Sequence, residues 1–168
     1  MVMDEAVVGR GYERVGRIIV AWGLLDRALI AETWRTKTPV GRWPDRVAAG
    51  FGRRCAEWGK LHKADQALLD HLRALSTKRD DMAHNVVSVE AANGSASVVV
   101  MRLETDWRRK FDRWARYLHL RAAARPAPPK DREYLHYSEA ELIRLEGEIS
   151  AARERVQGMS QAYRSMLS

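Results

Sequence analysis

Cysteine, lysine and long apolar runs are scarce in this chain of 168 residues. Cys55 is the only cysteine, which excludes an intrachain disulfide and a zinc site built from cysteines. The longest apolar run, Ile18 to Leu25, is too short to cross a bilayer, and no basic and apolar leader opens the chain. These absences predict a cytoplasmic protein without a membrane segment, and the length predicts a single domain over residues 1–168.

The positive charge of the chain comes almost wholly from arginine. There are 23 arginines against 6 lysines, and the formal net charge is +7. The flat guanidinium fork matches the oxygens of a phosphate group, so an arginine-rich surface favours nucleic acid as a partner. A GC-rich coding sequence produces the same bias together with many alanines, so the charge by itself leaves both interpretations open.

Apolar spacing predicts a mainly α-helical bundle, with a first helix over residues 12–34. Its apolar residues repeat every three or four positions and include Val15, Ile18, Trp22, Leu25 and Leu29. Prolines and a glycine predict a loop over residues 35–44, after which Asp45 caps a second helix that ends at Gly59. Cys55 lies on the apolar stripe of that helix, which favours a small buried side chain over a nucleophile.

A third helix is expected over residues 61–84, followed by a β-hairpin over about 86–103. The helix carries Leu61, Leu68, Leu72, Leu75 and Met82 at helical spacing, and Asn85 with the β-branched Val86 marks its end. The pair Asn93-Gly94 is a strong signal for a two-residue turn between alternating strands. The predicted fold is therefore an up-and-down helical bundle with a hairpin inserted after the third long helix.

Aromatic and basic residues alternate over residues 106–121, and a proline-rich connector follows at 125–130. The candidate nucleic-acid-binding residues of the segment are Arg108, Arg109, Lys110, Arg113 and Arg116. Interleaved aromatic and basic side chains can stack on and clamp a single strand, although an amphipathic helix with a solvated basic face has the same pattern.

The last helix is expected to run to about Leu167. Ser138 and Glu141 predict a capping box at its start, and Tyr137 with Leu142 a hydrophobic staple. An unbroken apolar seam from Leu142 to Met166 would pack inside the bundle or across a dimer.

Arg79 and His84, near the end of the third helix, are the residues with the clearest chemistry. Arg79 lies four residues after Leu75, on the apolar stripe, where a charge requires a buried carboxylate, a partner subunit or an anionic ligand. Cleavage of RNA without a metal needs a proton acceptor, a proton donor and a cation, which histidine and arginine supply. The helix C-terminus favours a protonated His84, and Asp80, four residues earlier, can orient its ring.

A single chain supplies one histidine and one arginine for this chemistry. Five residues of an unbroken helix turn about 140° and rise roughly 7.5 Å, so Arg79 and His84 would not share a face. Either the helix unwinds before His84, or a second copy completes the site. A two-fold dimer would place two arginines and two histidines around one cleft, and we therefore expect a homodimer.

The long first helix with Trp22, the third helix that ends in Arg79-Asp80-Asp81-Met82-Ala83-His84, and the hairpin after it resemble the HEPN family (higher eukaryotes and prokaryotes nucleotide-binding). That family is marked by an Arg, four to six residues that begin with Asn, Asp or His, and a His; the matching positions are Arg79, Asp80 and His84. The resemblance implies a dimeric, metal-independent endoribonuclease that uses no cofactor, as in many toxins and phage-defence effectors of the group.

By the same resemblance, Arg79 binds the scissile phosphate, His84 transfers protons and Asp80 supports them. An antitoxin or other regulatory protein is an implied partner. The toxin branch that is paired with a nucleotidyltransferase often has a tyrosine two residues after the histidine, where this chain has Val86, which argues against that antitoxin mechanism. The alternatives are a catalytically silent HEPN-like module for dimerisation or binding, and a nucleic-acid-binding regulator built on the basic segment. We predict no metal site, because His62, His71 and His84 have no ligand-like pairing three or four residues away and the carboxylates near them can equally be helix surface.

Overall fold

The computed structural model describes residues 4–37, 50–92, 94–103 and 132–167. Within these residues the fold is mainly helical, as the sequence predicted. Four helices are present, with a three-stranded antiparallel sheet inserted after the third helix. The helices are α1 (Glu5–Lys37), α3 (Phe51–His62), α4 (Gln66–His84) and α6 (Glu139–Leu167). The strands are β1 (Val86–Ala92), β2 (Ser95–Leu103) and β3 (Arg132–Ser138), paired in the order β1-β2-β3.

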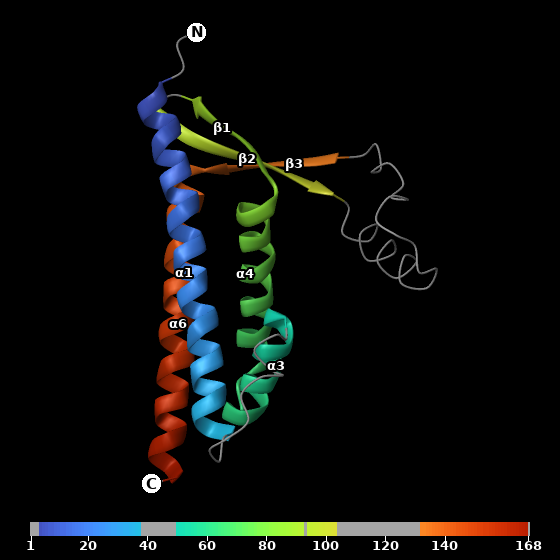
Figure 1. Cartoon of the computed structure of the whole chain (residues 1–168), viewed down its shortest axis with the longest axis vertical. Coiled ribbons are helices and arrows are strands. Elements are labelled where there is room, and N and C mark those ends of the chain that lie inside the picture. Colours follow the sequence, from blue (N-terminus) through green and yellow to red (C-terminus); the bar gives the residue numbers. More distant parts are fainter. Residues whose placement is uncertain (1–3, 38–49, 93, 104–131, 168) are drawn as a thin grey trace, which may run out of the picture.

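The helices α1 and α6 lie side by side along the long axis and run in the same direction, whereas α4 runs the opposite way (Figure 1). The sheet crosses the end of the bundle where α1 begins and α4 ends, and α3 lies at the other end (Figure 1). Because β3 leads directly into α6, the sheet returns the chain to the end at which α1 started. The insertion therefore allows the first and last helices to pair in parallel.

Apolar side chains of α1 and α6 form the centre of the core. Trp22, Leu25 and Leu29 of α1 are at most 3% exposed, and Trp22 is a core residue as its spacing predicted. The predicted seam of α6 is buried at Leu142, Leu145, Ile149, Ala152 and Val156. The seam packs against α1 of the same chain. It ends before the last turn, because Met166 is 81% exposed.

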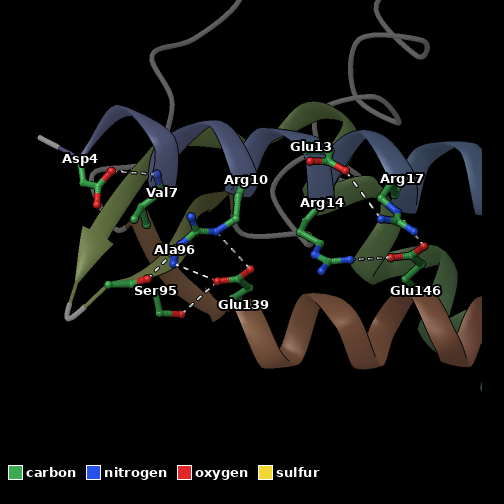
Figure 2. A network of polar contacts seen from close by, with 11 residues as sticks. Asp4, Val7, Arg10, Glu13, Arg14, Arg17, Ser95, Ala96, Glu139 and Glu146 are labelled. Carbon is green, nitrogen blue, oxygen red and sulfur yellow. Dashed lines mark hydrogen bonds and ion pairs between the residues drawn. The ribbon is translucent and has the colours of Figure 1, made fainter.

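Ion pairs along one flank fasten the first half of α1 to α6. Figure 2 shows Arg10, Arg14 and Arg17 of α1 turned towards α6. Arg10 pairs with Glu139 at 3.8 Å. Glu146 pairs with both Arg14, at 3.6 Å, and Arg17, at 3.1 Å. Each pair is at least partly exposed, so each contributes roughly 0–1 kcal/mol. Their main consequence is that these three arginines of α1 point towards α6.

The predicted capping box at the start of α6 is confirmed. The Ser138 backbone N–H donates to Glu141 Oε2 at 2.8 Å, and the Glu141 N–H donates to Ser138 Oγ at 3.3 Å. The hydrogen bonds from Ser138 lower the pKa of the Glu141 carboxyl below its usual range.

Three helix boundaries differ from the sequence-based prediction. The first helix is longer than 12–34 and covers Glu5–Lys37. The helix predicted over 61–84 begins only at Gln66, because Lys63 adopts the left-handed conformation with φ 51° and ends α3. Asp65 then caps α4, accepting a hydrogen bond from the Leu68 N–H at 2.7 Å. The apolar spacing continues through this break, so it gave no sign of it.

Gly59 does not end the second helix, as had been predicted, but lies inside α3. A Cβ at this position would come within 2.8 Å of Leu69, so glycine allows α3 and α4 to approach closely. Gly11 has the same role in α1, where a Cβ would collide with Val89 of β1. That close approach allows the first turns of α1 to pack against the sheet.

The predicted hairpin is confirmed as β1 and β2, with Gly94 at a φ of 76° in the turn. The sequence did not predict the third strand, β3, which pairs with β2 along its whole length from Arg132 to Ser138. The cap Asp45, the basic segment 106–121 and the connector 125–130 lie outside the described residues. No helix in the described ranges has both the length and the apolar character needed to span a membrane.

Candidate functional site at the end of α4

Helix α4 continues without a break through Arg79, Asp80 and His84. It ends at Asn85, whose N–H donates to the Asp81 carbonyl oxygen at 3.0 Å. The unwinding before His84 that the sequence left open does not occur. Arg79 and His84 therefore point about 140° apart around the helix, and one chain does not bring them to the same face.

Arg79 lies against the aromatic core, as its place on the apolar stripe predicted. Its side chain is 23% exposed, and the guanidinium carbon is 5.1 Å from the ring centroid of Trp22. Trp22 in turn packs on Phe51, with ring centroids 4.2 Å apart. A guanidinium over a tryptophan face contributes about 0.5–1 kcal/mol, more where water is excluded, and holds the group in a defined place.

The carboxylate that pairs with Arg79 is exposed, not buried. Arg79 Nη1 lies 3.0 Å from Asp80 Oδ1, and the Asp80 side chain is 55% exposed. Arg79 Nε and Trp22 Nε1 are buried donors without an acceptor in the described part of the chain. A buried donor that lacks an acceptor costs about 1–3 kcal/mol. The Arg79 guanidinium thus has binding capacity that these residues do not use.

His84 is exposed in the last turn of α4. Among the described residues it forms no hydrogen bond or ion pair, and the predicted contact with Asp80 is not present because Asp80 pairs with Arg79. The prediction that Asp80 orients the His84 ring is therefore wrong for this chain on its own. The side chain of His84 is accessible to a ligand or to a second protein.

Asp81, which the sequence analysis did not single out, is the buried carboxylate of this region. It is 2% exposed and accepts hydrogen bonds from Arg102 Nε at 3.0 Å and from the Tyr137 hydroxyl at 3.1 Å. Asn85 Nδ2 lies 3.4 Å from Asp81 Oδ1. Burial, followed by the charge of Asp81, raises the pKa of Tyr137 to about 12. Asp81 therefore joins α4 to β2 and β3, and its role is structural.

No local pattern in the sequence could have predicted the contacts of Asp81 with Arg102 and Tyr137. Arg102 is 21 residues from Asp81 and Tyr137 is 56 residues from it. The Tyr137 contact depends on β3, which the sequence did not reveal, and the Arg102 contact depends on how β2 packs against α4. Alternation along the strand places Arg102 on the same face as Val98 and Val100, and this is the one available signal of a buried partner.

A second polar cluster, at the opposite end of the bundle, is closed to solvent. Glu32 is 4% exposed, His62 is 6% exposed and Ser160 is fully buried. Ser160 accepts a hydrogen bond from Trp58 Nε1 at 3.1 Å and lies 3.5 Å from His62 Nε2, and Arg164 pairs with Glu32. Burial lowers the pKa of His62, although the charge of Glu32 opposes the shift. A serine beside a histidine can be a nucleophile, but no substrate reaches a serine without exposed surface.

The remaining reactive candidates are also explained by packing. Cys55 is fully buried, and burial raises the pKa of its thiol to about 12, so it is a core residue as expected. No three metal-ligating side chains come together in the described parts of the chain. The nucleic-acid-binding candidates Arg108, Arg109, Lys110, Arg113 and Arg116 lie outside those parts.

Comparisons with known proteins do not assign a family. No protein-family model matches the sequence, and neither the curated proteins nor the solved structures gave a significant match. The function is therefore inferred from the geometry at the end of α4.

Proposed function

We propose that this protein is a metal-independent endoribonuclease whose active site forms from the α4 ends of two copies. One observation carries the proposal. Arg79 lies in the core stripe beside Trp22, yet the buried carboxylate of the region, Asp81, is engaged by Arg102. Because the described residues offer Arg79 no buried carboxylate, the proposal takes up the other two partners that the sequence allowed, an anionic ligand and a partner subunit.

The positions of the other groups support the same chemistry. The exposed Asp80 is a weak competitor for Arg79, since exposed ion pairs contribute only about 0–1 kcal/mol. A phosphate can replace it and offer an acceptor to the fork of the guanidinium. His84 is exposed five residues later, where a substrate can reach it. A divided site accounts for Arg79 and His84 pointing away from each other on one helix.

The proposed reaction is an attack of the RNA 2′-hydroxyl on the adjacent phosphorus. His84 of one copy accepts the 2′-hydroxyl proton as the 2′-oxygen bonds to phosphorus. The bond from phosphorus to the 5′-oxygen breaks, and protonated His84 of the partner subunit donates a proton to the departing oxygen. Arg79 stabilises the negative charge of the phosphorane. The products are a 2′,3′-cyclic phosphate and a 5′-hydroxyl.

The test is cleavage of a mixed RNA pool in EDTA by the wild type and by His84→Ala, with the product ends mapped. We expect wild-type cleavage to leave 2′,3′-cyclic phosphates, and His84→Ala to be slower by about 10²- to 10⁴-fold. The matched control is His71→Ala, since His71 is an exposed histidine on the same helix. His71→Ala should cleave at the wild-type rate.

Equal rates for the wild type and His84→Ala would contradict the proposal, and so would cleavage that EDTA abolishes. Circular dichroism of His84→Ala should match the wild type, because the side chain that is removed is exposed. This check separates loss of chemistry from loss of fold.

A catalytically silent module for binding or dimerisation is the second candidate, and the pairing of charges favours it. Three basic residues at this end have carboxylate partners: Lys78 pairs with Glu148, Arg79 with Asp80 and Arg102 with Asp81. A module of this kind binds RNA or a second protein through the α4 end without cleaving RNA. RNA binding that Arg79→Ala weakens, with no cleavage by the wild type, would select this candidate.

A further inference from the structure

The outward face of α1 carries apolar side chains that nothing in the described chain covers. Tyr12 is 56% exposed, Val20 is 64% exposed and Leu24 is 41% exposed. The arginines of this half of the helix do not protect the face, because they turn towards α6 (Figure 2). The face therefore carries exposed apolar side chains along several turns, together with Glu13, which pairs with Arg17 at 3.6 Å.

Three glycines, Gly9, Gly16 and Gly23, follow the same face at intervals of seven residues. At 100° per residue they fall within about 40° of one another around the helix. Glycine destabilises a helix interior relative to alanine, so its repeated use on one face needs a reason. A seven-residue repeat is the spacing at which one helix keeps facing a second helix.

Packing within the chain does not provide that reason. A Cβ at Gly11, on the inner face of α1, would collide with Val89. At Gly9, Gly16 and Gly23 a Cβ would meet no atom within 4 Å. The space over these glycines is open, and a second backbone can approach there.

The charges at the two ends of the face indicate which helix fits. Glu5 and Arg27 are both exposed, and neither forms an ion pair among the described residues. If two copies of α1 lie antiparallel with Gly16 opposite itself, residues whose numbers add up to 32 face each other. Gly9 then faces Gly23, Tyr12 faces Val20, and Glu5 faces Arg27, at both ends of the pair.

We propose that the outward face of α1 binds α1 of a second copy in this antiparallel register, with the two-fold axis at Gly16. A parallel arrangement would place Glu5 against Glu5 and Arg27 against Arg27, which like-charge repulsion disfavours. The antiparallel register forms two opposite-charge pairs and places a small residue opposite a small residue along the contact. The interface is isologous, as a two-fold dimer requires.

The pairing also determines where the two α4 ends lie. Arg79 lies at the level of Trp22 on α1, and Val89, just beyond the end of α4, lies at the level of Gly11. The end of α4 is therefore near the level of Gly16, where the axis passes. Trp22 and Gly11 lie about 120–140° from Gly16 around α1, on the side away from the paired face. The two α1 helices therefore lie between the two α4 ends, and a site divided between two α4 ends requires a separate contact. The pairing itself is derived from α1 and does not depend on the proposed cleavage of RNA.

The test is disulfide crosslinking of full-length single-cysteine additions under mild oxidation. We expect Gly16→Cys to crosslink to itself, because residue 16 meets its own copy at the axis. Gly9→Cys and Gly23→Cys should each stay uncrosslinked alone and should crosslink when mixed. The wild type is the background control, since its one cysteine, Cys55, is fully buried.

Gly147→Cys is the matched control on α6, where a glycine is likewise exposed with nothing within 4 Å. Self-crosslinking of Gly147→Cys in place of Gly16→Cys would overturn the proposal in favour of α6. Self-crosslinking of Gly9→Cys alone would overturn the antiparallel register. A wild type that stays monomeric at its highest soluble concentration in sedimentation would overturn the pairing altogether.

A charge reversal tests the register without a new cysteine. Arg27→Glu should raise the dimer dissociation constant roughly tenfold, because both end pairs become repulsive. Adding Glu5→Arg to the same chain should restore the wild-type constant, and no restoration would contradict the register. Crosslinking without RNA cleavage would support the α1 pairing and contradict the proposed ribonuclease function. Cleavage without crosslinking would contradict the pairing and support the ribonuclease function.

Discussion

The two ends of the helical bundle use buried carboxylates in different surroundings. At the end formed by α1, α3 and α6, the polar groups Glu32, His62 and Ser160 are all at most 6% exposed and contact one another or Arg164. At the end formed by α4 and the sheet, Asp81 is just as buried, but Arg79 and His84 beside it reach the surface.

The difference separates structural polar groups from candidates for function. Polar groups that satisfy one another inside a bundle specify how its helices pack, and they offer nothing to a ligand. Within the described part of the chain, the one ion-pair partner of Arg79 is the exposed Asp80, which makes Arg79 the stronger candidate for binding a ligand. The two arginines of that end, Arg102 and Arg79, should therefore respond differently to substitution.

The largest effect on stability is expected from Arg102→Met. It removes the guanidinium that faces Asp81 and leaves a carboxylate that is 2% exposed, with Tyr137 and Asn85 as its remaining partners among the described residues. We expect the free energy of unfolding in urea to fall by about 3 kcal/mol. Adding Asp81→Asn should recover part of the loss, because the unpaired charge is removed.

Arg73→Met is the control, since Arg73 forms an exposed pair with Asp70 at 2.7 Å on the same helix. Its effect should stay within about 0.5 kcal/mol. A loss no larger for Arg102→Met than for Arg73→Met would show that the Asp81 cluster does not hold α4 to the sheet.

An intermediate effect is expected when His62 at the other end is protonated. Burial lowers its pKa in the folded state, so the unfolded chain binds the proton more tightly. The stability that comes from neutral His62 is fully present above the ordinary pKa of 6.5 and is lost as the pH falls through the folded-state pKa. Glu32 and Arg164 are the charges that face it, and they act in opposite directions.

Urea unfolding at about pH 7.5, 6 and 5 measures this loss. His62→Gln should flatten the pH dependence in this range, whereas His71→Gln, an exposed histidine on α4, should leave it as in the wild type. Equal slopes for the wild type and His62→Gln would indicate that the buried cluster does not sense acid.

The helices and the hairpin could be predicted from the sequence because their signals are local. The apolar seam of α6, its capping box and the Asn93-Gly94 turn each lie within a few residues. The break at Lys63 could not be predicted, because a non-glycine residue takes a positive φ there while the apolar spacing continues. Strand β3 was missed because its partner, β2, is distant in the sequence.

Part of the candidate site could also be predicted, because helical periodicity is a local signal. The place of Arg79 on the apolar stripe follows from helical periodicity, and the structure puts it against Trp22. The partner of each charge could not be read from spacing. Asp80 pairs with Arg79 and not with His84. Asp81 of α4 accepts a hydrogen bond from Arg102 of β2. Identity and spacing predict which helix face a charge occupies, whereas its partner depends on tertiary contacts.

The smallest effect on stability is expected from Arg79→Met, which removes a cation–π contact of about 0.5–1 kcal/mol. The melting temperature should therefore stay near that of the wild type, in contrast to Arg102→Met. Methionine keeps an apolar side chain against Trp22, so only the charge and the donors are lost.

The rate of RNA cleavage per folded molecule of Arg79→Met, in EDTA and beside Arg73→Met, tests the central claim most directly. We predict a loss of about 10²-fold or more for Arg79→Met, as for removal of a group that stabilises a transition-state charge, and no loss for Arg73→Met. A folded Arg79→Met that cleaves RNA at the wild-type rate would contradict the assignment of Arg79 to the phosphate.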